Sequence, residues 1–372
     1  MNGLRILLLN YEFPPLGGGA APVTEHLSKA LAGHTFDLVT MGFPGLPAEE
    51  RVGTIHVHRV PCKRKRKELS TTLEMLSFLR PAWKKANELI AKNNYDLIHC
   101  HFILPTGVLA WRLSRKHGIP YIISTHGSDI PGYNPDRFQL LHKLLLPFWR
   151  AIVRKARLIL TPSENLRRLV LKSWNAPEHI KAIHWGIDIP PAPKGKKENR
   201  ILFAGRLFER KGAGTLVDAA LKMNLKGWEV AIVGDGPQRA ELERKAKNNS
   251  AIKFYGWMPR EKLQKFYEKS KIFAFVSTAE SFGLVLAEAM AAEMAVVTSN
   301  ESACPEVVGD AGITIPAKDP QALKAALESL MRSPKQIEAL GNAGRKRVLD
   351  QFTWEQCAKE YDKVYRSVAK TG

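Results

Sequence analysis

Two glutamates in the second half of the chain stand among apolar residues. Glu280 and Glu288, with seven residues between them, follow the apolar, strand-like segment 272–276. On a helix that opens there, the carboxylates would lie about 12 Å apart along the axis, with Glu288 two turns beyond Ser281 on one face. One carboxylate would then bind hydroxyls of a sugar and the other a ribose diol, while the helix opening Ser281-Phe282-Gly283-Leu284 faces a diphosphate.

A plainer interpretation of the pair is a helix-start glutamate followed by a solvated one. The neighbours of Glu288 argue against it, because they are apolar: Leu286, Ala287, Ala289 and Met290. An unpaired buried carboxylate is costly. The spacing therefore favours a binding role for both glutamates.

Two cations follow the first strand-like segment of the second half, 200–204. Arg206 and Lys211 would lie at the carboxyl edge of a sheet, where ligands of open α/β sheets bind. Arginine offers a forked pair of donors and lysine a point charge, so together they would stabilise charge that develops on a leaving diphosphate. The alternative is a basic loop on an already basic protein.

Two glycine-containing loops also follow strand-like segments. Gly17-Gly18-Gly19 lies between the first strand and the first helix, where glycines let backbone N–H groups approach a phosphate. The dinucleotide fingerprint fails, because Pro22 replaces its third glycine and no acidic residue ends the second strand. Gly234-Asp235-Gly236-Pro237 follows a second-half strand, and we expect Pro237 to be the first residue of a helix.

Histidines mark the ends of two strands in the first half. His126 follows the strand 121–124, and a neutral imidazole there can hydrogen-bond a sugar hydroxyl or support a departing phosphate. Asp129, three residues on, is a candidate acceptor-side ligand. His99 and His101 share a strand face, but without a nearby carboxylate they are too few for a metal site; His101 is a weaker candidate for a site residue.

Together these residues resemble the retaining glycosyltransferases of family four. Glu280 and Glu288 match the Glu-x7-Glu motif of that family, and Arg206 and Lys211 match its paired cations. The resemblance extends across the chain. It departs from the family at 301–306, where relatives often carry a glycine-rich turn before the Pro-Glu pair, so contacts of this loop with the donor sugar are left open.

The resemblance implies the GT-B fold: two Rossmann-like doubly wound domains that face each other across a cleft, with the donor on the C-terminal side. It implies that Gly18 and Gly19 approach the donor diphosphate, that Gly234 lines the nucleotide pocket and that 255–257 lies near the base. It further implies that His126 contacts the donor sugar and the reaction centre, and that no divalent metal is needed.

The length of 372 residues fits two domains better than one core. Strands are predicted at 5–9, 36–41, 54–59, 96–100, 121–124 and 158–161, and then at 200–204, 229–233, 252–255, 271–276 and 295–298. Alternating strand and helix signals predict parallel sheets. We expect an N-terminal domain at 1–186, a Pro- and Lys-rich linker at 187–199 and a C-terminal domain at 200–352, with a final helix at about 353–370 that the resemblance returns to the N-terminal domain.

The net charge of +20 indicates a polyanionic partner. The basic clusters are 63–67 and, after the apolar run 144–149, Arg150, Arg154, Lys155 and Arg157. Basic residues beside exposed Leu, Phe and Trp suit peripheral contact with an anionic membrane, although a solvated basic face is an equal alternative. Nucleic acid is disfavoured, because none of its binding signatures is present.

The N-terminus reads as a strand and not as a signal peptide, and no apolar run approaches the roughly 18 residues of a membrane span. The four cysteines lack a pairing pattern, which predicts a cytoplasmic protein. We expect metal-independent, retaining transfer of a hexose or N-acetylhexosamine from a nucleotide diphosphate sugar, with a UDP-sugar favoured, to a glycan or lipid-linked acceptor and without a cofactor. A nucleotide-sugar epimerase and a non-catalytic basic membrane adaptor remain alternatives.

Overall fold

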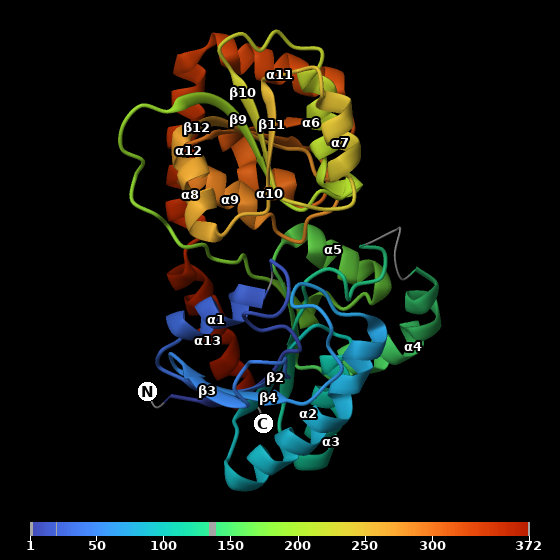
Figure 1. The fold of residues 1–372 in the computed structure, drawn as a ribbon. Helices are drawn as coiled ribbons and strands as arrows, with labels where there is room; N and C mark the ends of the chain where they lie inside the picture. Colours follow the sequence, from blue (N-terminus) through green and yellow to red (C-terminus); the bar gives the residue numbers. More distant parts are fainter. Residues whose placement is uncertain (1–2, 20, 134–138, 371–372) are drawn as a thin grey trace. The chain divides into compact units, whose positions relative to one another are not determined.

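The computed structural model describes residues 3–19, 21–133 and 139–370, and its chain folds into two compact units (Figure 1). The first unit contains Met1–Gly186 and Trp354–Gly372, and the second contains Ile187–Thr353. Residues 187–199, which the sequence suggested as a linker, belong to the second unit, whose first strand already begins at Glu198.

The first unit is built on an eight-stranded sheet in the order β3-β4-β2-β1-β5-β6-β7-β8. Its strands are β1 Arg5–Leu9, β2 Thr35–Met41, β3 Glu49–Val52, β4 Ile55–Val60, β5 Leu97–His101, β6 Tyr121–Ser124, β7 Leu158–Thr161 and β8 Ile180–Ala182. All neighbours are parallel except β3, which pairs antiparallel with β4 at the edge. The central strands are buried on both faces, which explains their continuous apolar sequences.

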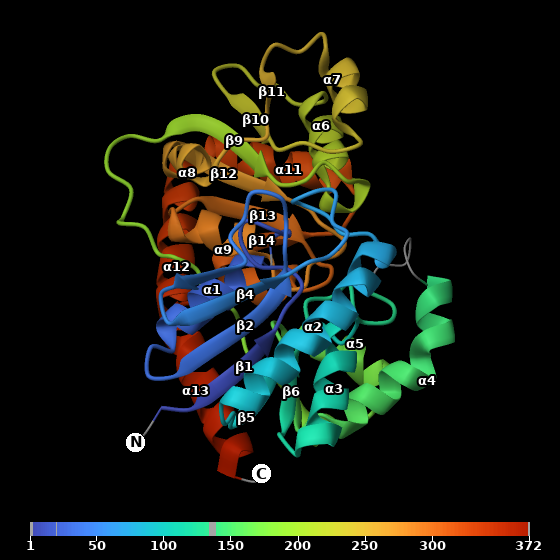
Figure 2. The same ribbon diagram turned by 60° about the horizontal axis from the view of Figure 1, so that its bottom comes forward.

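Helices cover both faces of this sheet. One face packs against α2 Thr72–Lys92, α3 Thr106–His117, α4 Gln139–Lys155 and α5 Glu164–Ser173. The other packs against α1 Ala21–Ala30 and the C-terminal helix α13 Trp354–Lys370, which lie side by side in both ribbon views (Figures 1 and 2). Tyr361 and Tyr365 of α13 are buried, so the end of the chain completes the core of the first unit.

The second unit is a six-stranded parallel sheet in the order β11-β10-β9-β12-β13-β14. Its strands are β9 Glu198–Ala204, β10 Glu229–Val233, β11 Ile252–Gly256, β12 Ser270–Phe275, β13 Ala295–Ser299 and β14 Gly312–Ile315. Its helices are α6 Ala213–Ala220, α7 Arg239–Ala246, α8 Arg260–Lys269, α9 Leu284–Ala291, α10 Cys304–Val308, α11 Pro320–Arg332 and α12 Pro334–Gln351. Short 3-10 turns of this unit lie at Glu209–Lys211 and Gly309–Ala311, and a further one, Pro177–His179, belongs to the first unit.

Each sheet reverses its strand order once. In the second unit the chain moves from β9 outward to β10, and from β12 outward to β13 in the opposite direction. In the first unit β1 and β5 are the corresponding neighbours. Because parallel crossovers are right-handed, the connections that leave such a pair run over opposite faces of the sheet. Ligands of open α/β sheets bind where the two connections part.

The expected fold class, two doubly wound α/β domains, is confirmed. The strands predicted at 5–9, 121–124, 158–161 and 229–233 have the bounds expected. Strands β3, β8 and β14 were not predicted, because they are short and lack a continuous buried run. No helix in the described part of the chain is both long and apolar enough to cross a membrane.

Candidate active site

The reversal point of the second sheet brings Lys211 and Glu280 together. Lys211 ends the turn after β9, and Glu280 lies in the loop after β12. The Lys211 Nζ atom lies 2.5 Å from Glu280 Oε1 and 3.3 Å from the carbonyl oxygen of Ala279. The two side chains are only 20% and 11% exposed. Residues that we assigned to separate parts of a donor therefore form one ion pair.

Gly212 allows Lys211 to reach this place. Its φ angle is +81°, and a Cβ atom there would lie 2.5 Å from the carbonyl oxygen of Val276. A side chain at this position would both strain the backbone and collide with the end of β12. The glycine thus fixes the turn that presents Lys211 to the neighbouring strand.

Glu280 does not lie on a helix, which corrects the sequence interpretation. Helix α9 begins at Leu284, and Gly283 before it has a left-handed backbone with φ +101°. Ser281 also precedes the helix, so it does not share a helix face with Glu288. The Glu280 N–H group donates to Ser302 Oγ at 3.0 Å, which anchors the loop. The 12 Å helical spacing consequently does not describe this pair.

Glu288 lies in the second turn of α9 and has partners that the sequence analysis did not foresee. Arg260 Nη2 lies 3.2 Å from its Oε1 atom, and the Tyr267 hydroxyl donates to its Oε2 atom at 3.3 Å. Burial raises the pKa of the Glu288 carboxyl, while Arg260 and Tyr267 oppose that rise. The carboxylate is therefore half-buried and paired, so the argument from an unpaired charge was wrong.

The loops after β9 and β10 are interlocked through their backbones. A Cβ atom on Gly234 would lie 1.9 Å from the carbonyl oxygen of Gly205, so this close approach requires glycine. The Leu207 N–H group donates to the carbonyl oxygen of Asp235 at 2.9 Å. Half-buried Arg206 stands in this fixed loop, five residues before Lys211. The two predicted cations therefore belong to the same rigid edge of the sheet.

Pro237 is not the first helical residue, contrary to the prediction. Helix α7 begins at Arg239, and Gln238 precedes it as the cap. The Gln238 N–H group donates to the carbonyl oxygen of Leu207 at 3.1 Å, and Gly236 N–H to Asp235 Oδ1 at 2.8 Å. These contacts extend the loop by two residues before the helix can start.

In the first unit, the glycine loop follows β1 at its reversal point. Gly17 has φ +109°, and its N–H group donates to the carbonyl oxygen of Lys67 at 2.7 Å. Gly18 N–H lies 3.4 Å from Glu12 Oε2, and Gly19 is exposed, with no atom of the described residues, its chain neighbours aside, within 4 Å of an added Cβ. Open space beside Gly19 permits close approach of an anion, and diphosphate contact by Gly18 and Gly19 stays a prediction.

His126 follows β6 and is buried at 7% exposure. Its Nε2 atom lies 3.0 Å from His101 Nδ1, and its ring packs against Phe102 and Trp185. Its Nδ1 atom has no hydrogen-bond partner within the described part of the chain. Burial, and then His101, hold the pKa of His126 well below its ordinary value, so the ring is neutral at pH 7. One ring nitrogen is thus buried without a hydrogen-bond partner among the described residues.

His101 is the residue that orients His126, a role which the sequence analysis underweighted. Its ring nitrogens lie 3.4 and 3.5 Å from Thr24 Oγ1, and Asn10 Nδ2 donates to that hydroxyl at 2.9 Å. Burial lowers the pKa of His101 to about 3. The signal available in the sequence was its place at the carboxyl end of β5, beside the strand that carries His126.

His99, by contrast, has a structural role. Its ring nitrogens lie 2.8 Å from the hydroxyls of Ser124 and Tyr365, so it ties β5 to β6 and to α13. Burial is the main cause that lowers its pKa well below the usual range.

Asp129 organises the loop that carries His126. Its carboxylate accepts hydrogen bonds from the N–H groups of Ile103, His126 and Gly127 at 2.8 to 3.1 Å. Trp149 donates to its carbonyl oxygen at 3.0 Å. Asp129 is 4% exposed, so these contacts support a structural role, and direct contact with an acceptor stays a prediction.

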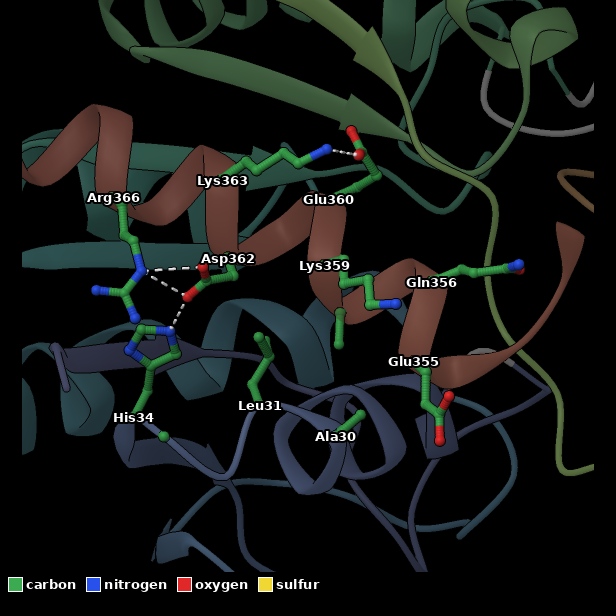
Figure 3. A pocket seen from close by; sticks show the side chains of 12 residues that line it. Ala30, Leu31, His34, Glu355, Gln356, Lys359, Glu360, Asp362, Lys363 and Arg366 are labelled. Atoms are coloured by element: carbon green, nitrogen blue, oxygen red, sulfur yellow. Dashed lines mark hydrogen bonds and ion pairs between the residues drawn. The ribbon is translucent and has the colours of Figure 1, made fainter. Parts of the chain in front are cut away.

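A surface pocket of about 640 Å³ lies elsewhere on the first unit, between the end of α1 and α13 (Figure 3). Figure 3 shows His34 and Arg366 directed at the Asp362 carboxylate, at 2.8 and 2.9 Å. The residues that line it include none of the predicted site residues. Two of its carboxylates are already paired, Asp362 with His34 and Arg366 and Glu360 with Lys181 and Lys363. The reversal points of the two sheets, each within its own unit, remain the candidate sites.

Comparison with known proteins identifies the family. The model described as "Glycosyltransferase Family 4" matches residues 17–189, and that described as "Glycosyl transferases group 1" matches residues 187–347. The chain belongs to the family-four glycosyltransferases. This family-four glycosyltransferase therefore has the GT-B fold. The two matches together cover both reversal points described above.

The relatives extend over the whole chain. An alpha-maltose-1-phosphate synthase of Mycolicibacterium smegmatis is 28% identical, over 98% of this chain and 100% of its own length. Among solved structures, the sucrose-phosphate synthase of Thermosynechococcus elongatus has a TM-score of 0.85 at 23% identity and covers 99% of this glycosyltransferase and 100% of its own chain. HepE of Anabaena, solved with UDP-glucose, has a TM-score of 0.77 at 19% identity, over 98% and 100% of the two chains. Those structures share the fold of this protein.

Proposed function

We propose that this glycosyltransferase transfers a hexose or N-acetylhexosamine from a nucleotide diphosphate sugar to an acceptor hydroxyl with retention of anomeric configuration. The observation that carries the proposal is the Lys211–Glu280 ion pair at the reversal point of the second sheet. A partly buried ammonium held by a carboxylate is a fixed charge, and fixed charges stabilise a developing diphosphate without reorganisation.

Lys211 has a specific role in this proposal. Its ammonium has three donors, and the contacts with Glu280 and Ala279 account for two of them. The third would bind a diphosphate oxygen, with Arg206 contributing a forked pair of donors from the same loop. As the bond from the anomeric carbon to the phosphate oxygen breaks, negative charge appears where these two cations lie.

Retention follows if the acceptor hydroxyl attacks the face from which the diphosphate departs. The hydroxyl proton then moves to an oxygen of the departing diphosphate, and a new bond forms from the acceptor oxygen to the anomeric carbon. This path needs no carboxylate base. One oxygen of the Glu280 carboxylate is paired with Lys211. The other oxygen would accept a hydrogen bond from a sugar hydroxyl.

We propose that Glu288 binds the ribose diol and that the backbone of 281–284 lies along the diphosphate. Arg260 and Tyr267 would hold the Glu288 carboxylate in place for the diol. Neutral His126 would use its unpartnered Nδ1 atom toward a hydroxyl of the transferred sugar, and Gly18, Gly19 and Gly234 would approach the donor closely.

A UDP-sugar is the favoured donor, because HepE, a protein of the same fold, was solved with UDP-glucose. The proposal includes no metal or cofactor, since Arg206 and Lys211 supply the positive charge that a divalent ion would otherwise bring. The four free cysteines suit a reducing compartment, so we place the enzyme in the cytoplasm.

We also propose that the acceptor is glycan or lipid-linked and that the first unit contacts an anionic membrane. Lys63, Lys65, Arg66 and Lys67 are exposed, and Leu69, Leu73 and Leu76 nearby are 41%, 79% and 54% exposed. Cations beside exposed leucines match the chemistry of a lipid interface.

Two residues of the predicted basic and apolar clusters do not fit this role. Arg64 is 6% exposed and donates to the carbonyl oxygens of Tyr11, Arg66 and Lys67. Trp149 is 1% exposed and belongs to the core. The membrane test is therefore vesicle co-sedimentation with Lys63, Lys65, Arg66 and Lys67 changed to Gln and Arg64 kept. Sedimentation that these changes leave unaltered would show that this cluster does not hold the protein on lipid, and no sedimentation of the wild type with anionic lipid at low salt would favour a soluble acceptor.

Release of free nucleotide from UDP-, GDP- and ADP-sugars tests the main proposal. A transferase should hydrolyse its donor slowly without an acceptor, and the Lys211→Ala variant should lose this release. An epimerase would convert the sugar without releasing nucleotide, and an adaptor would do neither. Release that is absent with all three donor classes would refute donor binding by this enzyme.

A further inference from the structure

We propose that the first unit holds a divalent transition-metal site of the zinc type, formed by Asp37, His56 and His58. Asp37 lies on β2, and the two histidines lie on β4, where Asp37 and His56 are in register. One ligand atom from each residue can be chosen so that all lie within 4.8 Å of one another. Asp37 and His56 lie in the amino-terminal halves of their strands and His58 near the middle of β4, whereas the glycine loop and His126 follow the carboxyl ends of β1 and β6.

The distances from Asp37 to the two histidines match zinc geometry. Asp37 Oδ1 lies 3.4 Å from His58 Nε2 and 3.5 Å from His56 Nδ1. In a tetrahedral zinc site, bonds of about 2.1 Å separate adjacent ligand atoms by about 3.4 Å. Two imidazoles and one carboxylate are also the ligand types that bind zinc in open sites.

The Asp37 carboxylate is divided between two tasks. Its Oδ2 atom accepts hydrogen bonds from Arg5 Nε and Nη2 at 3.1 and 2.9 Å and from the Tyr95 hydroxyl at 2.8 Å. Its Oδ1 atom faces only the two imidazoles among the hydrogen bonds and ion pairs described for it. The side chain is 3% exposed, so one oxygen is held firmly while the other is directed at the histidines.

Glu49 sets the state of His58. The Glu49 Oε1 atom lies 3.1 Å from His58 Nδ1 and would accept a hydrogen bond from its N–H group. In that neutral tautomer the Nε2 lone pair of His58 points at an oxygen lone pair of Asp37, which is unfavourable unless a proton or a metal ion lies between them. A carboxylate that orients a metal-binding histidine in this way is the usual outer shell of a zinc site.

Charge decides how tightly the site can bind. Asp37 and Glu49 are opposed by Arg5 and by Lys85, whose Nζ atom lies 3.0 Å from Glu49 Oε1. Exposed Arg51 stands opposite His56 in the register of β3 and β4. These cations weaken attraction for a divalent ion. The rival explanation of the same geometry is a cluster of protonated histidines between two carboxylates.

His56 is 37% exposed at its side chain, so an ion can enter from solvent. The bound ion would join β2 to β4 and, through Glu49, to the edge strand β3. The site would stabilise the first unit, and its loss would leave the proposed transfer chemistry intact.

Zinc binding to metal-free protein without a purification tag tests the proposal. Isothermal titration should show one Zn²⁺ per chain, Co²⁺ should give the intense visible absorption of a tetrahedral site, and Zn²⁺ should raise the melting temperature. Ca²⁺ and Mg²⁺, which prefer oxygen ligands, should not compete.

Variants decide whether these residues are the ligands. His58→Ala should abolish the Co²⁺ spectrum, and Glu49→Gln should weaken Zn²⁺ binding about 10- to 100-fold. His56→Ala tests the same point at an exposed position if His58→Ala fails to fold, and His179→Ala is the matched control at an exposed histidine. The proposal would be overturned if Zn²⁺ did not bind one to one, or if a folded ligand variant bound Zn²⁺ as wild type does. Either result would favour protonated histidines.

Discussion

Each unit has one reversal point in its sheet, but the side chains at the two reversal points differ in their chemistry. The second unit places the Lys211–Glu280 ion pair at its reversal point and contains no histidine in its sequence from 187 to 353. All eleven histidines lie in the first unit, where neutral His101 and His126 stand at the corresponding strand ends. In the proposed function, the fixed charge would stabilise a diphosphate and the neutral rings would contact uncharged hydroxyls.

The candidate residues of the two units are not equally easy to recognise in the sequence. Charged side chains among apolar residues are conspicuous, so the candidate ligands of the second unit were predicted from their spacing. The histidines of the first unit work through packing and mutual hydrogen bonds. Which of His99, His101 and His126 keeps an unpartnered nitrogen depends on neighbours more than twenty residues away.

The largest effect is expected from Lys211→Ala. Loss of a positioned donor for developing charge lowers turnover about 100- to 1,000-fold, and Arg206→Ala should act in the same direction. The initial rate of nucleotide release at saturating donor measures this. Lys245→Ala is the control, because it removes an exposed lysine that pairs with Asp218. Near-normal turnover of Lys211→Ala would show that turnover does not depend on a fixed positive charge in the second unit.

The histidine content predicts that acid acts on the first unit before the second. His99, His101 and His126 have folded-state pKa values below their unfolded value of about 6.5. Above that pH neither state is protonated, so their full contribution to stability is present. As pH falls below 6.5, the unfolded state binds more protons, and each histidine lowers the free energy of unfolding by up to about 1.4 kcal/mol per pH unit.

Hydrogen exchange at pH 7 and pH 5 checks this prediction. Protection factors, which correct for the slower intrinsic exchange at pH 5, should fall in β5, β6 and α13 while those of β9 and β12 are kept. An equal fall in both units would show that the buried histidines do not govern acid stability.

A smaller effect should separate the two glutamates. Glu288→Gln should weaken binding of free UDP about tenfold, because a hydrogen bond to a charged group contributes about 1.5 kcal/mol or more. Glu280→Gln should spare UDP binding and lower turnover, since it disturbs the sugar side and the Lys211 partner. Titration calorimetry with UDP on both variants measures the difference, and equal losses would contradict one carboxylate for each end of the donor.

The smallest effect concerns Ser302, in the segment that departs from the family pattern. Ser302 accepts the Glu280 N–H group and has φ +55°. Ser302→Ala should cost about 1 kcal/mol of stability through the lost hydrogen bond, whereas Ser302→Gly recovers part of that cost because glycine favours this backbone. Thermal melts of the two variants compare these terms. A Gly variant less stable than the Ala variant would show that backbone strain is not relieved there.

Sequence by itself determined the strands that are buried on both faces and the residues at their carboxyl ends. Runs such as those of β1, β6 and β10 are apolar because both faces are covered, so pattern and structure agree. The edge strands β3, β8 and β14 were missed because partial exposure removes that pattern. The paired cations and the Glu-x7-Glu spacing likewise indicated a family-four glycosyltransferase without any coordinates.

Only the tertiary structure decided what those residues touch. The left-handed backbone of Gly283 delays α9 and puts Glu280 in a loop, where Lys211 reaches it from 69 positions away in the chain. Helix α8 supplies the partners of Glu288. Arg64 is buried and donates to the carbonyl oxygens of three residues, although the sequence placed it in a basic cluster expected to face a membrane or solvent. Spacing in the sequence gives only the distance along the chain. Charge pairing depends on which strand ends lie next to each other in the sheet.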